Sequence, residues 1–139
     1  MKSLPTLMRV KQRELDALKR QQATLEKRRD DLLNAVDQLT DQLVQELKAA
    51  EGLPDMAHFF GGFSASIKKR QETMHAQIRK LEGEIDKLAQ LIMVAFSELK
   101  KLDLAYAAWK KREAEKLRLR EQQEMDEIGI RGYVRKDAV

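Results

Sequence analysis

Few side chains in this sequence are of the kinds that perform catalysis or bind metal ions. The chain has two histidines, His58 and His75, and no cysteine. Neither histidine has a carboxylate at metal-ligand spacing on a shared face, and no Ser–His–Asp set can be assembled around them. The pair Gly61-Gly62 lacks the Lys-Ser/Thr that follows a phosphate-binding loop. We therefore expect no catalytic residue, no cofactor and no metal site, and we interpret the protein as a non-enzyme.

The composition favours long helices over a layered core. Charged residues make up 36% of the chain, which has only two prolines and six glycines, as in coiled coils. The absence of cysteine is compatible with a reducing cytosol. There is no apolar run of the ~18 residues that a membrane span needs, and residues 1–20 are too charged for a secretory signal. We expect a soluble, intracellular protein.

The densest basic run lies in residues 110–127. Six acidic residues in the same stretch neutralise it, so one interpretation is a solvated helix with ion pairs along its own surface. A helix without an apolar stripe gains little from remaining isolated, so the other interpretation is that it orders inside a partner's polar channel. The basic residues are Lys110, Lys111, Arg112, Lys116, Arg118 and Arg120.

Apolar residues gather at two places that suit contacts with another protein. In 91–96, only Ile92 and Ala95 fit the helical stripe described below, which leaves Leu91, Met93, Val94 and Phe96 for a third helix, self-association or a docking partner. The other phenylalanines, Phe59, Phe60 and Phe63, lie near Gly61-Gly62. They either fold back to cap the end of a coiled coil or form a mobile hydrophobic hook.

The stripe that organises the chain runs through residues 67–109. Apolar residues recur there at alternating steps of four and three, a mean of about 3.5, which keeps one seam of a helix against a partner helix. Only Gln71 breaks the apolar run. The seam positions are Ile67, Gln71, Met74, Ile78, Leu81, Ile85, Leu88, Ile92, Ala95, Leu99, Leu102, Tyr106 and Trp109.

Residues 3–51 supply the partner helix. Ser3 is a plausible N-cap, and Pro5 falls in the first turn, where its missing N–H costs little. Gly52 and Pro54 form a helix stop. The expected seam positions are Leu4, Met8, Lys11, Leu15, Leu18, Gln22, Leu25, Arg29, Leu32, Val36, Leu39, Leu43, Glu46 and Ala50.

The sequence therefore predicts an all-α fold, a long antiparallel two-helix coiled-coil hairpin in one domain, 1–139. We expect helix 1 at about 3–51, a connection at 52–63 and helix 2 at about 64–128, capped by Ser64 or Ser66. Pairing outward from the turn brings Leu4 to the level of Trp109. The stretch 110–128 would then be a charged helical overhang, followed by a frayed tail, 129–139.

Two further functions fit such a hairpin. A self-associating scaffold would bury Leu91, Met93, Val94 and Phe96 in a four-helix dimer. A nucleic-acid-binding arm would use basic residues on phosphates, although alternating charges over most of the chain argue against nucleic acid as a partner. Those basic residues are Lys19, Arg20, Lys27, Arg28, Arg29, Lys68, Lys69 and Arg70.

Three stretches resemble the FliJ family of flagellar export proteins, especially its alphaproteobacterial-type members. The opening MKSLPTLMRVKQRELDALKRQ is similar to that family's N-terminal helix, and PDMAHF resembles the stretch before its second helix. Near the end, EQQEMDEIG resembles its C-terminal motif, carried here by Met125, Asp126 and Glu127. With the two-helix plan, the resemblance spans essentially the whole chain.

The resemblance implies an antiparallel coiled coil similar to the central stalk of rotary ATPases. Its partners would be the hexameric flagellar export ATPase, the export gate protein and export chaperones, and these would hold it at the cytoplasmic face of the inner membrane at the flagellar base. The overhang would face the ATPase ring through Arg112, Lys116, Arg118, Arg120, Glu124, Met125, Asp126, Glu127 and Ile128. The gate or chaperones would contact Phe59, Phe60, Phe63, Leu91, Met93, Val94 and Phe96.

Overall fold

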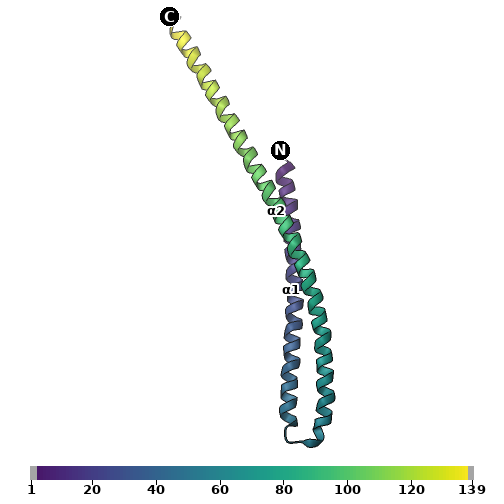
Figure 1. Cartoon of the computed structure of the whole chain (residues 1–139). Coiled ribbons are helices and arrows are strands. Elements are labelled where there is room, and N and C mark those ends of the chain that lie inside the picture. Colours follow the sequence, from purple (N-terminus) through teal and green to yellow (C-terminus); the bar gives the residue numbers. More distant parts are fainter. Residues whose placement is uncertain (1–2, 138–139) are drawn as a thin grey trace. The chain divides into compact units, whose positions relative to one another are not determined.

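The computed structural model describes residues 3–137. Helix α1 spans Ser3–Ala50, a short 3-10 helix η1 spans Pro54–Met56, and helix α2 spans Ala57–Asp137 (Figure 1). The described residues contain no strand. Two long helices pack against each other, so the predicted all-α helical hairpin is confirmed.

Contacts divide the chain into two compact units. The hairpin unit is Arg13–Ala95, and the terminal unit combines Met1–Gln12 with Phe96–Val139. The single coiled-coil domain that the length suggests stays a prediction.

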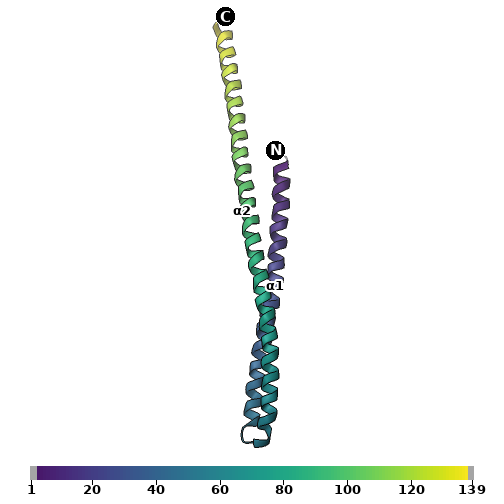
Figure 2. The same ribbon diagram turned by 45° about the vertical axis from the view of Figure 1, so that its right-hand side comes forward.

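In the hairpin unit, α1 and α2 run antiparallel from the turn that joins them (Figures 1 and 2). Every predicted seam position in this unit is buried or half-buried except Glu46, which is exposed. The seam prediction is therefore confirmed at all these positions but one. Its core consists of Leu15, Val36, Ile67, Ile78, Ile85 and Ala95.

Gln71, the polar break in the stripe, joins the two helices through hydrogen bonds. Its side-chain amide donates to the Val36 carbonyl oxygen at 3.0 Å and to Thr40 Oγ1 at 2.8 Å. The Thr40 hydroxyl in turn donates to the same Val36 carbonyl at 3.2 Å. Because these bonds form at one pairing of α1 with α2, they help to fix the register of the hairpin.

The turn between the helices forms where the sequence predicts a stop. Gly52 has a φ of 84°, a left-handed conformation that suits glycine after a helix end. The Leu53 amide donates to the Ala50 carbonyl at 3.2 Å, and the Met56 amide donates to the Leu53 carbonyl at 3.0 Å. These bonds carry the chain from α1 into η1.

The start of α2 differs from the expected one. The helix begins at Ala57 instead of Ser64, so most of the predicted connection is helical, and Ser64 and Ser66 lie inside the helix and do not cap it. Phe60 and Phe63 are half-buried in these first turns. Their burial against the end of α1 offsets the cost of Gly61-Gly62, which is about 1 kcal/mol for each glycine in a helix.

In the terminal unit, the first residues of α1 pack on the part of α2 that follows Phe96. Leu99 is buried, and Leu4 and Met8 are half-buried. Lys11 Nζ lies 3.2 Å from Glu98 Oε2, which links the two helices. The rings of Tyr106 and Trp109 stack at 5.9 Å, and both are half-buried.

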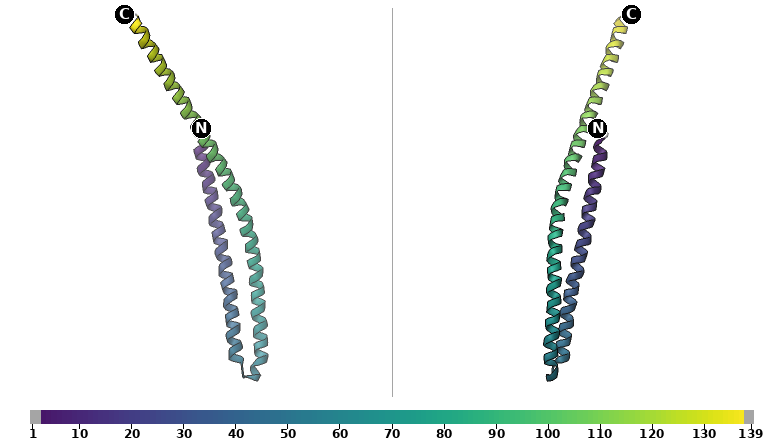
Figure 3. Two further views of the ribbon diagram at one scale, coloured as in Figure 1. Left: turned by 60° about the vertical axis from the view of Figure 1, so that its left-hand side comes forward. Right: turned by 90° about the vertical axis from the view of Figure 1, so that its right-hand side faces the viewer.

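After Trp109, α2 continues without a partner helix within the terminal unit (Figure 3). Every side chain described from 110 to 135 is exposed. The helix continues through Gly129 and Gly132 to Asp137, so the predicted frayed tail is helical over 129–137. Residues 138–139 of that tail lie outside the described residues.

Candidate partner-binding surfaces

The stretch of α2 predicted to face the ATPase ring is a single charged helix. Two ion pairs form along its surface, Lys116 with Glu113 at 3.4 Å and Arg118 with Glu115 at 2.7 Å, each between residues i and i+3. The Arg118 guanidinium also donates a hydrogen bond to Glu115, and this bond lowers the pKa of the Glu115 carboxyl below its ordinary value. Local pairs of this kind stabilise exposed helices only slightly.

Further along the same helix, the acidic groups have no such partners. Within residues 3–137, Glu124, Asp126 and Glu127 have no ion pair. Met125 is 72% exposed and Ile128 is 67% exposed. The expected ring-facing residues therefore lie together on one solvent-exposed helical segment, charged and apolar side chains intermixed.

The burial of residues 91–96 agrees with the position of each residue relative to the apolar stripe. Ile92 is half-buried and Ala95 is buried, so these two face the partner helix. In the hairpin unit Leu91, Met93 and Val94 are all exposed, Met93 to 71%. Phe96, the first residue of α2 in the terminal unit, is also exposed.

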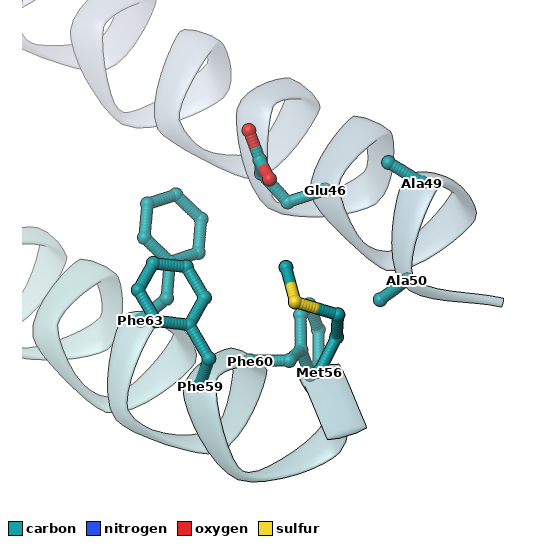
Figure 4. A pocket seen from close by; sticks show the side chains of 7 residues that line it. All are labelled: Glu46, Ala49, Ala50, Met56, Phe59, Phe60 and Phe63. Atoms are coloured by element: carbon teal, nitrogen blue, oxygen red, sulfur yellow. The ribbon is translucent and has the colours of Figure 1, made fainter. Parts of the chain in front are cut away.

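The three phenylalanines near the turn contribute to a small cavity at the end of the hairpin unit. Phe60 and Phe63 are half-buried, whereas Phe59 is 64% exposed. Two of them therefore pack toward α1, as a cap on the end of the coiled coil would, and Phe59 stays accessible to solvent. Their contact with another protein stays a prediction. Figure 4 shows Glu46 on α1, across the cavity from Met56 and the aromatic rings.

Sequence reasoning missed the α1 side of this cavity. Glu46, Ala49 and Ala50 line it from the last turns of α1, and Met56 lines it from η1. Glu46 and Ala50 were expected only as seam positions. One feature of the sequence could have indicated this side of the cavity. Glu46 is a polar residue at a seam position, and a cluster of phenylalanines follows it on the other side of the turn.

The structure adds three observations about chemistry. No group of three or more His, Asp or Glu side chains among residues 3–137 is arranged to hold a metal ion. In the same part of the chain, no helix combines the length and the apolar character that crossing a lipid bilayer requires. Within residues 3–137, no buried side-chain polar atom of a non-exposed residue lacks a hydrogen-bond partner.

Comparison with known proteins identifies the family. The model of the flagellar FliJ protein family matches residues 1–138. The flagellar FliJ proteins of two strains of Caulobacter vibrioides, NA1000 and CB 15, are each 29% identical to this chain over 126 residues, which cover 91% of both sequences. No solved structure gives a significant match. Because the family model covers nearly the whole chain, the protein belongs to the flagellar FliJ protein family.

Proposed function

We propose that this protein is a non-enzymatic stalk of the flagellar protein-export apparatus. In this role the unpartnered end of α2 binds the hexameric export ATPase, and other surfaces contact the export gate and export chaperones. Membership of the FliJ family supports a flagellar role. The finer assignment of partners is our inference.

One observation carries the proposal. Beyond Trp109, α2 continues to Asp137 although none of its side chains described up to residue 135 is buried. A helix that buries no apolar stripe is only marginally stable in water, because most helical stability in proteins comes from packing. Such a segment gains the most stability from a partner that surrounds it, because packing is then possible on every side of the helix. A channel along the axis of an ATPase ring is a partner of this geometry.

Binding would raise ATPase activity by mass action. A ligand that binds the assembled ring, and not its separate subunits, shifts the equilibrium toward the ring by an amount set by its concentration and affinity. The ring-binding residues would be Arg112, Lys116, Arg118, Arg120, Glu124, Met125, Asp126, Glu127 and Ile128.

Apolar residues at two places outside the ring-facing segment, exposed except for the half-buried Phe60 and Phe63, are candidates for the gate and the chaperones. Contiguous apolar side chains on a protein surface often mark interaction sites. The protein would then be cytoplasmic and would associate with the inner membrane only through these partners. The candidate residues are Phe59, Phe60, Phe63, Leu91, Met93, Val94 and Phe96.

The test is the turnover of the flagellar export ATPase with and without this protein. We expect the full chain to increase turnover at low ATPase concentration, where the ring is incompletely assembled. A chain truncated after Trp109 should lose the stimulation, because it lacks the unpartnered segment. Analytical ultracentrifugation of the ATPase should show more hexamer with the full chain than with the truncated one.

A matched control separates the ring contact from the other surfaces. Met93→Glu places a charge on an exposed position of α2 outside the proposed ring contact, and it should stimulate the ATPase as the unaltered chain does. Stimulation that survives truncation would refute the ring contact at 110–137. No stimulation and no change in hexamer assembly would refute the stalk function itself.

A further inference from the structure

The cavity at the end of the hairpin unit combines aromatic walls with one carboxylate. Phe59, Phe60 and Phe63 line it together with the Met56 thioether, and Glu46 is the only charged residue among the described ones that line it (Figure 4). Aromatic faces attract cations through their electron-rich centres, and a carboxylate beside them adds a charge-assisted hydrogen bond. Such a lining suits a guanidinium or ammonium group better than an apolar or anionic one.

Glu46 is available for such a ligand. Its side chain is exposed, and within residues 3–137 it has no ion pair or hydrogen bond. It occupies a seam position, where an apolar residue would have extended the core of the hairpin. The chain therefore places an unpaired carboxylate where the two-helix fold alone favours leucine.

The surroundings of the cavity are acidic, although the protein is basic. The whole chain has a formal net charge of +4. In residues 46–65, the loop end of the hairpin unit, Lys48 is by contrast the only lysine or arginine, and three carboxylates are exposed. Lys68, Lys69 and Arg70 lie further along α2 and do not line the cavity. The three carboxylates belong to Glu46, Glu51 and Asp55.

The cavity is too small for a cofactor. Its volume is about 40 Å³, whereas small-molecule sites usually have about 300–1,000 Å³. It has room for the end of one side chain. Leu53, Met56 and Phe59 are exposed beside it and offer apolar surface to the rest of a bound segment.

We propose that the loop end of the hairpin unit binds a basic amphipathic segment of a partner protein, with one arginine or lysine side chain seated against Glu46 among the three phenylalanines. The apolar residues of that segment pack on Phe59, Met56 and Leu53. Its remaining cations face the surrounding carboxylates, which attract it over a range set by ionic strength. This inference rests on the proposed function of Phe59, Phe60 and Phe63 as a contact with an export component, and it specifies the chemistry of that component.

The experiment measures binding of synthetic peptides to the full chain by fluorescence anisotropy. The probe is a labelled amphipathic helical peptide with leucines on one face and arginines beside them. The matched probe carries citrulline, which has the shape of arginine without its charge, at every arginine position. We expect the arginine peptide to bind about tenfold more tightly than the citrulline peptide, the gain typical of a charge-assisted hydrogen bond.

Two variants locate the effect. Glu46→Gln should remove most of the preference for arginine, and Phe59→Ala should weaken both peptides. Asp41→Asn removes the same charge from an exposed position that does not line the cavity, and it should keep the preference. All three positions are exposed, so the variants should fold as the unaltered chain does.

Several outcomes would overturn the inference. Equal affinity of the two peptides for the unaltered chain would show that no cation is recognised, and the same holds if neither peptide binds. An equal loss of preference in Asp41→Asn and Glu46→Gln would show only general attraction to an acidic surface. The proposed stalk function is measured separately through ATPase turnover, so either idea can fail without the other.

Discussion

At the scale of single residues, two glycines differ in what their backbones require. Gly83 lies in the interior of α2, and a Cβ added there would meet no atom within 4 Å. Gly52 also has open space around it, but its φ of 84° is one that side-chain-bearing residues rarely adopt. The same substitution should therefore have opposite effects at the two sites.

We expect Gly83→Ala to raise the free energy of unfolding by about 0.5–1 kcal/mol, because alanine loses less conformational entropy than glycine in a helix. Gly52→Ala should lower it by about 1–2 kcal/mol through strain in the left-handed conformation. Urea unfolding followed by circular dichroism at the helix band would measure both. A loss of stability in Gly83→Ala would mean that this position meets a neighbour in solution, such as a second copy.

At the scale of helices, the polar bridge from Gln71 links α1 to α2 inside the hairpin unit. Gln71→Ala removes two hydrogen bonds and part of the seam packing. We expect it to lower the free energy of unfolding by about 1–3 kcal/mol. Gln90→Ala changes the same residue type at an exposed position of α2 and should stay within about 0.5 kcal/mol.

The register can be tested directly, because the chain contains no cysteine. Cysteines introduced at Thr40 and Gln71 lie on neighbouring positions of the two helices and should form a disulfide under mild oxidation faster than a pair further apart. A pair at Thr40 and Met74 is displaced along the seam and should form one slowly. Equal rates for the two pairs would show that the hairpin slides between registers.

Most of the fold could be predicted from the periodicity of the apolar residues, because the seam between the two helices favours apolar side chains at each contact position. Even the polar Lys11 proved half-buried, with its ammonium group paired to Glu98. The start of α2 could not be predicted in the same way. Gly61-Gly62 indicates a loop locally, and only tertiary burial of Phe60 and Phe63 overrides that preference.

The cavity at the loop end was only half predictable from the sequence. The phenylalanines stand out as a cluster, but the position of Glu46 opposite them depends on where α2 begins and how the turn closes. The unpartnered end of α2 was easier to find, because its seam positions become charged after Trp109. The extension of this helix to Asp137 was not predicted, because Gly129 and Gly132 are residues that often end helices.

At the scale of the whole molecule, stability should be distributed unevenly along α2. Amides near Ile78 and Ile85 belong to a helix with a buried seam, and they open only when that packing is lost. Amides from 113 to 137 belong to a segment whose side chains, described up to residue 135, are all exposed. An isolated helix of this length is marginal, so it opens locally at little cost in free energy.

Hydrogen exchange followed by mass spectrometry would measure this difference. In the free chain we expect peptides from 113–137 to exchange at least about a hundredfold faster than peptides around Ile85, which corresponds to roughly 3 kcal/mol less opening free energy. Adding the export ATPase should slow exchange in 113–137 selectively, because a segment enclosed by a ring can open only after it leaves the ring. Slow exchange in the free chain would instead mean that the segment already has a partner in solution. Sedimentation velocity would then be expected to show a dimer, and the self-associating scaffold would replace the stalk as the better account of this helix.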